Sequence, residues 1–220
     1  MKKYKEILSK CPLFYGIGEE DLYRMLGCLG ARVISFDKKY TVFAEGSPAR
    51  DIGILLSGEA QVMLVDYYGN RSILGSVTPG EMFGEAFASA ELDSLPVTVV
   101  ATEPSEVMLI DCSHIMHTCN NACGFHQRLI FNLMKDIAKK NVALYKKSEI
   151  TSKRTTRDKL LCYLSLEAMR QRSSTFVIPF DRQELADYLG VDRSGLSVEI
   201  SKLKKEGVIK ADRSRFTILQ

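Results

Sequence analysis

Residues 181–206, DRQELADYLGVDRSGLSVEISKLKKE, constrain this chain most strongly, because they encode two short helices joined by a tight turn. Asp181 stands at the N-cap position of the first helix, and Glu184 three residues later completes a capping box. Gly190 supplies the sharp turn between the two helices. The stretch therefore predicts a helix-turn-helix, whose second helix enters the major groove of DNA.

The second helix presents polar side chains on the face away from its apolar positions. Asp192 is placed to cap this helix, and Arg193 is the best base-reading candidate because Arg pairs bidentately with guanine. After Gly207, the segment VIKADRSRFTIL alternates like a two-stranded ribbon, which predicts a winged helix. The alternative is an ordinary helical hairpin with a solvated charged face. The predicted DNA contacts are Gln183, Arg193, Ser194, Ser197, Ser201 and Lys202.

The distribution of charge and the composition favour a DNA-binding protein and argue against a membrane-spanning or secreted one. Residues 149–220 hold 14 Lys and Arg against 10 Asp and Glu, whereas residues 1–148 hold 16 against 17. The positive excess thus lies in the part that carries the candidate DNA-binding motif. The sequence lacks a continuous apolar run of about 18 residues, as a membrane span needs, and its charged N-terminus lacks an apolar signal region. We therefore expect a cytoplasmic protein with no membrane partner, whose six cysteines form no disulfide framework.

Short runs rich in β-branched and aromatic residues fill the chain between Val33 and Asp111. Gly, Pro, Asp or Asn separate these runs at a spacing of roughly 8–12 residues, which is typical of an antiparallel barrel or jelly roll. Tyr68-Gly69-Asn70 is expected to form a hairpin turn within this region. A helical segment precedes the strands.

A long helix is predicted from residue 122 to residue 148. Its apolar positions follow a 3-4-7 spacing, which is that of a short coiled-coil seam, so this helix is the expected homodimer interface. The alternative is that the helix packs onto its own barrel. The polar stretch at residues 146–159 breaks the apolar pattern and is the expected hinge. The seam consists of Ile130, Leu133, Ile137 and Leu144.

All three histidines and three of the six cysteines lie between Cys112 and His126. Cys119, Cys123 and His126 have i, i+4, i+7 spacing, so a helix places them on one face. Thiolate and imidazole ligands at this spacing could hold zinc, an iron–sulfur cluster or haem, and the thiols alone could sense redox state. The alternative is that the two cysteines are small buried residues at the start of the long helix and that His126 is a polar neighbour.

Several motifs, taken in order, connect this chain with a known family. The first half contains F-x-E-G-S-P-A at residues 43–49, I-L-x-S-G-E at residues 54–59 and P-G-E-M-F-G-E at residues 79–85. The second half contains T-T-R-D-K-L-L-C-Y-L at residues 155–164, followed by the helix-turn-helix. With this order of barrel, long helix and winged helix, the chain resembles the cyclic-AMP receptor protein and fumarate–nitrate regulator family, usually called Crp/Fnr.

The resemblance implies an α+β fold with three parts. These are a cyclic-nucleotide-binding-like antiparallel β-barrel (jelly roll) that senses the effector in residues 1–121, a dimerisation helix in residues 122–148, and a winged helix-turn-helix in residues 149–220. The iron–sulfur regulators of this family carry most of their cysteine ligands in a close cluster near the N-terminus. Here that region offers only Cys11 and Cys28, far apart, so an oxygen-sensing cluster is not carried over.

The resemblance also places a phosphate-binding cassette at Gly84-Glu85-Ala86-Phe87. In cyclic-nucleotide binders an Arg-Ser or Arg-Thr pair follows this cassette, but the matching positions here are Leu95 and Pro96. A phosphate buried without a cation costs several kcal/mol, so we expect the pocket to be unsuited to cyclic AMP. The alternative is a filled barrel without a ligand. The predicted effector pocket consists of Gly84, Glu85, Ala86, Phe87, Leu95, Pro96, Val97, Leu144 and Tyr145.

Together these observations predict a homodimeric transcription factor that reads a pseudo-palindromic operator in duplex DNA, acts with RNA polymerase and responds to an unknown small-molecule effector. Ser194 and Val198 stand where the family usually has Glu and Arg in the recognition helix, so a familiar half-site is not assumed. No cofactor is required, and the absence of a nucleophile–base pair, an acidic dyad and a P-loop argues against an enzyme. The alternative is a regulatory sensor subunit that does not act through DNA.

Overall fold

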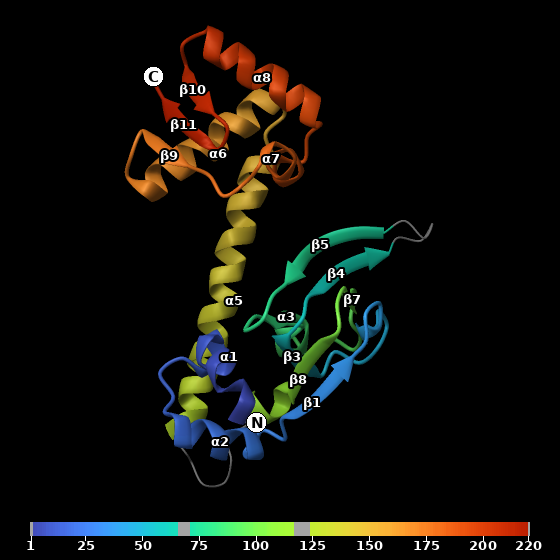
Figure 1. Ribbon diagram of the computed structural model, residues 1–220. Coiled ribbons are helices and arrows are strands. Elements are labelled where there is room, and N and C mark those ends of the chain that lie inside the picture. The colour runs from blue at the N-terminus through green and yellow to red at the C-terminus, as the bar shows by residue number, and fades with distance from the viewer. Residues whose placement is uncertain (1, 66–70, 117–123, 220) are drawn as a thin grey trace. The chain divides into compact units, whose positions relative to one another are not determined.

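The computed structural model describes residues 2–65, 71–116 and 124–219. The chain forms two compact units, Met1–Lys139 and Lys140–Gln220. The long helix α5 (Gly124–Thr151) contributes residues to both units (Figure 1). This helix ends three residues beyond its predicted end.

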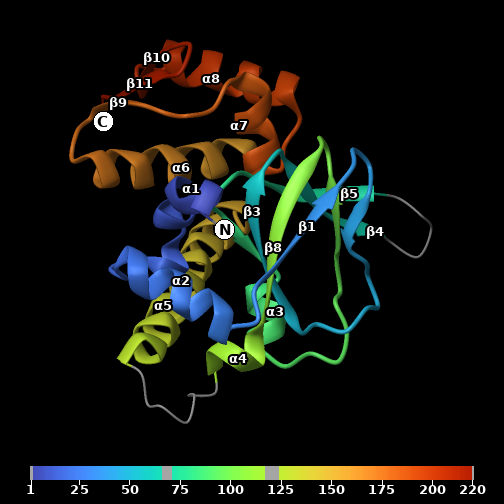
Figure 2. The same ribbon diagram turned by 60° about the horizontal axis from the view of Figure 1, so that its bottom comes forward.

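The N-terminal unit is built around two antiparallel four-stranded sheets (Figure 2). Their faces enclose one apolar core, in which the rings of Phe43 and Phe83 lie 5.1 Å apart. The predicted jelly roll is therefore confirmed. The predicted turn at Tyr68-Gly69-Asn70 lies outside the described residues. The first sheet has the order β1 (Arg32–Phe36), β8 (Ser105–Asp111), β3 (Asp51–Ser57), β6 (Met82–Phe83), and the second has the order β2 (Thr41–Phe43), β7 (Thr98–Ala101), β4 (Ala60–Val65), β5 (Arg71–Val77).

A second apolar core covers the outer face of the first sheet. Ile54 and Met108 point into it from β3 and β8, while Leu55 and Val107 point into the core between the sheets. Strands β3 and β8 are thus buried on both faces, which explains why their sequences are continuous apolar runs rather than alternating ones. The helical elements of this unit are η1 (Lys2–Tyr4), α1 (Lys5–Lys10), η2 (Pro12–Phe14), α2 (Glu19–Cys28), α3 (Glu85–Ser89) and α4 (Cys112–Met116).

The N-terminal helices pack against the first half of α5, as both ribbon views show (Figures 1 and 2). Leu133 is only 2% exposed and belongs to the second apolar core, and Ile130 and Ile137 are half-buried against the same core. This side of α5 thus has a partner within the chain, the alternative that the periodicity left open in a related form. Whether these residues also form a dimer seam stays a prediction. Leu144, the fourth seam residue, is exposed.

The C-terminal unit is a winged helix-turn-helix, as predicted. Its sheet has the order β10 (Ile209–Asp212), β11 (Arg215–Ile218), β9 (Thr175–Val177), so a third strand joins the predicted ribbon. Leu196, Ile200 and Phe216 lie in its apolar core. The break between α5 and the next helix covers only residues 152–155, less than the predicted hinge. The helices of this unit are α6 (Thr156–Gln171), α7 (Arg182–Leu189) and α8 (Arg193–Lys205).

Candidate DNA-binding surface and effector region

Local hydrogen bonds hold the two helices of the helix-turn-helix at their ends. The Glu184 backbone N–H donates to Asp181 Oδ1 at 2.8 Å, and the Asp181 N–H donates to Glu184 Oε2 at 2.7 Å. Gly190 ends α7 in the left-handed conformation at φ 61°, which glycine adopts without a steric penalty. The Gly195 N–H donates to Asp192 Oδ2 at 2.7 Å and caps α8. The predicted capping box, turn and second N-cap are all confirmed.

The buried side of α8 determines which residues face outward. Leu196, Ile200 and Leu203 are buried in the core of the C-terminal unit. Because α8 has one apolar side only, its opposite side is open to solvent. The exposed residues on that side are Ser194, Ser197, Val198, Ser201, Lys202 and Lys205.

Hydroxyl groups on this surface donate their protons within the chain. Ser197 Oγ donates to the Arg193 carbonyl at 3.0 Å, and Ser201 Oγ donates to the Ser197 carbonyl at 2.9 Å. Ser194 Oγ donates to Asp192 Oδ2 at 2.6 Å. These serines therefore offer lone pairs to an incoming ligand more readily than protons.

The basic residues of the predicted contact set differ in their availability. Within the described part of the chain, the Arg193 guanidinium forms no ion pair, so its donors remain available. Lys202 Nζ lies 3.6 Å from Glu199 Oε2 on the same helix. Gln183, on α7, donates its amide to Asp187 Oδ1 at 2.9 Å and must release this bond to reach a phosphate.

Arg157, at the start of α6, ties the end of the recognition helix to the rest of the unit. Its guanidinium donates to the two Glu206 carboxylate oxygens at 3.1 and 2.5 Å and to Glu199 Oε1 at 3.4 Å. This pairing lowers the pKa of the Glu206 carboxyl. No spacing along the chain signals this contact, because Arg157 is far from Glu199 and Glu206 in the sequence.

The cap of α8 makes a pH-dependent contribution to stability. The Ser194 hydroxyl, and then the Gly195 amide, lower the pKa of the Asp192 carboxyl. Because this carboxyl has a lower pKa in the folded state than in the unfolded state, it stabilises the fold fully at pH values above its unfolded-state pKa of about 3.9. This stabilisation is lost as the pH falls through the folded-state pKa. We expect unfolding followed by circular dichroism from pH 7 to pH 2 to show a smaller acid loss in Asp192→Asn, which keeps the cap but does not titrate. Identical acid profiles for the two proteins would contradict this assignment.

The predicted phosphate-binding cassette is a tight turn into a short helix. Gly84 precedes α3 at φ 79°, and a Cβ at this position would lie 2.7 Å from the ring of Phe43, so glycine is required there. Glu85 is buried, Ala86 is exposed and Phe87 is half-buried against the core between the sheets.

The segment after the cassette places its apolar side chains inside the jelly roll. Leu95 and Val97 are buried, whereas Pro96 is exposed. The Leu95 N–H donates to the Ser47 carbonyl at 2.8 Å, which holds the Leu95 side chain in the core between the sheets. The other two predicted pocket residues, Leu144 and Tyr145, are exposed residues of the C-terminal unit.

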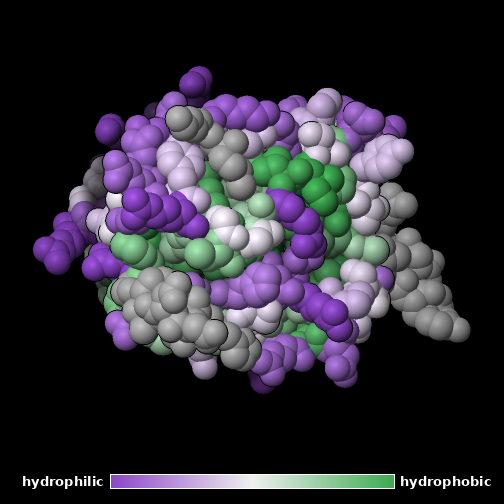
Figure 3. Space-filling model, turned by 90° about the horizontal axis from the view of Figure 1, so that it is seen from below, coloured by the Kyte–Doolittle hydropathy of each residue, from purple (hydrophilic) through white to green (hydrophobic). Residues whose placement is uncertain are grey.

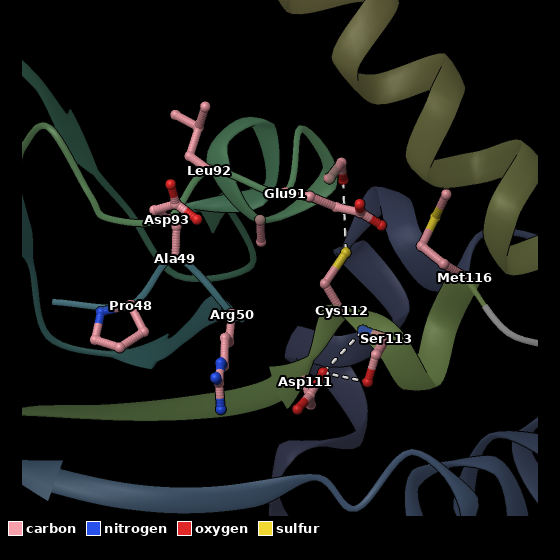
Figure 4. A pocket seen from close by; sticks show the side chains of 12 residues that line it. Pro48, Ala49, Arg50, Glu91, Leu92, Asp93, Asp111, Cys112, Ser113 and Met116 are labelled. Atoms are coloured by element: carbon pink, nitrogen blue, oxygen red, sulfur yellow. Dashed lines mark hydrogen bonds between the residues drawn. The ribbon is translucent and has the colours of Figure 1, made fainter.

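Two cavities flank Leu95 and the cassette helix, and Arg50 lines both. The first has a volume of about 510 Å³ and is lined by Arg50, Asp51, Phe43, Leu95 and Leu109, among others. The second, of about 480 Å³, is lined by Arg50, Ser89, Asp93, Asp111, Cys112 and Met116, among others (Figure 4). Within the described residues Arg50 forms no ion pair. The cassette motif does not point to this cation, because Arg50 lies well before Gly84 in the sequence.

Cys112 lines the second cavity as a protonated thiol. It is buried, its Sγ lies 3.6 Å from Ser89 Oγ, and burial raises the pKa of the thiol. It is therefore a small core residue, as expected for an inert cysteine.

The predicted metal or redox site is only partly described. Cys119 and Cys123 lie outside the described residues. His126 is buried and donates Nε2–H to the His114 carbonyl at 3.2 Å. Across residues 2–65, 71–116 and 124–219, no three metal-ligating side chains form a group. Metal or redox sensing at this window stays a prediction.

Comparison with known families defines the class of protein. The cyclic nucleotide-binding domain model matches residues 33–121, and the Crp-like helix-turn-helix domain model matches residues 159–220. A chain that joins these two domains is a transcriptional regulator and not an enzyme. It belongs to the Crp/Fnr family, which confirms the resemblance.

Two bacterial relatives illustrate the likeness in sequence. The chain is 23% identical over 200 residues to the transcriptional activator protein FnrL of Cereibacter sphaeroides, covering 84% of this chain and 75% of that protein. It is 30% identical over 105 residues to the CRP-like cAMP-activated global transcriptional regulator of Mycobacterium tuberculosis, covering 48% of this chain and 45% of that protein.

Solved structures share the fold. The catabolite activator protein of Thermus thermophilus has a TM-score of 0.51 at 21% identity, covering 94% of this chain and 93% of that one. The structure of CprK complexed with OCPA has a TM-score of 0.63 at 14% identity, covering 91% of this chain and 90% of that one. Among the described residues, no helix of this chain is long and apolar enough to cross a bilayer.

Proposed function

We propose that this regulator binds duplex DNA as a homodimer, with one α8 helix in the major groove of each half-site of a pseudo-palindromic operator. The observation that carries the proposal is the capped helix-turn-helix with an exposed, basic outer side on α8. Dimers of this kind place their recognition helices about one DNA turn, roughly 34 Å, apart. Arg193 reads a base, while Gln183, Ser201 and Lys202 contact phosphates, and Ser194 and Ser197 accept hydrogen bonds from base edges.

Selection of bound sequences from random duplexes, followed by gel shift, tests this proposal. The expected result is an inverted repeat with half-sites about ten base pairs apart, centre to centre. Failure to select any sequence, with the protein folded, would overturn DNA binding and favour a sensor subunit that does not act through DNA.

The dimer contact in this proposal uses a different face of α5 from the predicted seam. Phe131 is 55% exposed and Met134 is 58% exposed, and their spacing places them on one side of the helix. Further along α5, Val142 and Tyr145 are also exposed. Large exposed apolar side chains on a helix indicate a surface that a partner covers. The face of the N-terminal unit seen in Figure 3 is mostly hydrophilic around its edge, and apolar residues gather in patches toward its middle.

The effector in this proposal is a weakly acidic organic molecule rather than cyclic AMP. Leu95 offers no charge, and its side chain occupies the core where an arginine would have to reach a phosphate. Arg50 supplies a cation beside an apolar wall formed by Phe43, Leu95 and Leu109. In this proposal, binding of the effector shifts the regulator toward the conformation that binds DNA. The regulator acts in the cytoplasm and contacts RNA polymerase once it is bound to its operator.

Cyclic AMP is expected to give no heat in a calorimetric titration and no change in operator affinity. The physical reason is the lack of a charge-assisted hydrogen bond to the cyclic phosphate at Leu95 and Pro96. A dissociation constant below about 100 µM, together with stronger operator binding, would overturn this prediction. Arg50→Gln serves as the comparison, because any binding that depends on this cation disappears in that variant.

A further inference from the structure

Val198 is an apolar side chain at the centre of the exposed side of α8. It is 55% exposed, and it lies opposite Leu196 and Ile200, which are buried. A shallow hollow of about 430 Å³ borders it and is lined by Ser197, Val198, Ser201, Lys202 and Lys205. Val198 is absent from the apolar core of its own unit, so the fold does not account for a β-branched residue at this position.

The surroundings of Val198 favour close approach by a flat ligand. Ser194, Ser197 and Ser201 are small, and their hydroxyl protons are engaged within the chain. The long basic side chains of Lys202 and Lys205 lie to one end of this surface. The centre of α8 therefore presents two methyl groups framed by hydroxyl oxygens, with cations at the margin.

The major groove of DNA carries one kind of apolar group, the 5-methyl group of thymine. We propose that Val198 packs against a thymine methyl group in each half-site and thereby determines the preference for thymine at that position. This inference rests on the proposed insertion of α8 into the major groove. It adds a specificity residue to the predicted contact set, which contained polar residues only.

The expected size of the effect follows from the area that one methyl group removes from water. One buried methyl group is worth about a fourfold change in affinity, so a dimer with two half-sites is expected to lose roughly tenfold or slightly more when both methyl groups are removed. The loss of affinity is expected at one position in each half-site, because each subunit brings one Val198 side chain to the DNA.

The test uses the full-length protein and the operator obtained by selection. Each thymine is replaced in turn, symmetrically in both half-sites, by deoxyuracil, which removes the methyl group and preserves base pairing. The unaltered protein is expected to lose about tenfold in affinity at one position. Val198→Ala is expected to bind the thymine operator correspondingly more weakly and to bind thymine and deoxyuracil operators equally. Alanine is the better helix former, so α8 is retained, and circular dichroism verifies this.

Val177→Ala is the matched control, because Val177 is a similarly exposed valine outside α8. It is expected to keep the full preference for thymine over deoxyuracil. Equal binding of all deoxyuracil operators by the unaltered protein would overturn the inference, as would a preference that survives in Val198→Ala. These outcomes leave the proposed DNA binding intact, whereas failure to obtain an operator would overturn the proposed function itself.

Discussion

The double variant Phe131→Asp, Met134→Asp is expected to sediment as a monomer at micromolar concentration, whereas the unaltered protein sediments as a dimer. Both residues are exposed on one side of α5, and a carboxylate there would be buried without a partner when two helices meet. Because a dimer gains from binding two half-sites at once, its loss is expected to weaken operator binding by about a hundredfold or more.

Met169→Asp is the control for this experiment, since Met169 is 67% exposed on α6 and lies outside α5. It introduces the same charge in place of the same residue type and is expected to leave the dimer intact. Ile137 is unsuitable for the test, because it packs against the core of its own unit and an aspartate there would destabilise the monomer. A double variant that still sediments as a dimer would show that another surface carries the association.

Arg193→Ala is expected to weaken binding to the selected operator by about 1–3 kcal/mol per half-site, and by about twice as much for the dimer. Arg193 is exposed at the first position of α8, where the cap at Asp192 holds the helix end in place. A bidentate contact with guanine contributes this binding free energy only when guanine is present at that position. The variant is therefore expected to relax specificity at one position of each half-site in gel shifts with single-base operator variants.

Arg170→Ala removes the same charge from an exposed site on α6, where Arg170 pairs with Glu167 on the same helix. It controls for the general effect of positive charge, and it is expected to change affinity much less. If Arg193→Ala weakens all sequences uniformly and reduces the salt dependence by about one unit of slope per half-site, then Arg193 contacts a phosphate and the base-reading assignment is wrong.

The helix-turn-helix illustrates how much local interactions specify. The bonds that cap the N-terminal ends of α7 and α8 join Asp181 to Glu184 and Asp192 to Gly195, three residues apart in each case. Interactions of such short range are visible as spacing in the sequence, so caps, turn and buried side were all predicted correctly. The strand runs of the jelly roll were predictable for a similar reason, because burial on two faces requires continuous apolar residues in β3 and β8.

Contacts between segments that are distant along the chain could not be predicted from the sequence. The periodicity of Ile130, Leu133 and Ile137 showed that α5 has an apolar side, but the same periodicity suits a partner helix or the chain's own N-terminal helices. In the folded chain this apolar side packs against the N-terminal helices. Arg50 reached the cavity beside Leu95 through the pairing of strands, which no spacing along the chain reveals.

The sequence by itself thus determined the family, the order of the domains and the outward side of the recognition helix, since each depends on residues close together along the chain. The tertiary structure alone decided which side of α5 packs against the N-terminal helices, which cation borders the jelly-roll core and how Arg157 holds Glu199 and Glu206. The physical reason is that an apolar stripe or a charge in the sequence predicts that a side chain will be buried or paired. Only the folded chain determines which residues lie close enough to pack against it or to pair with it.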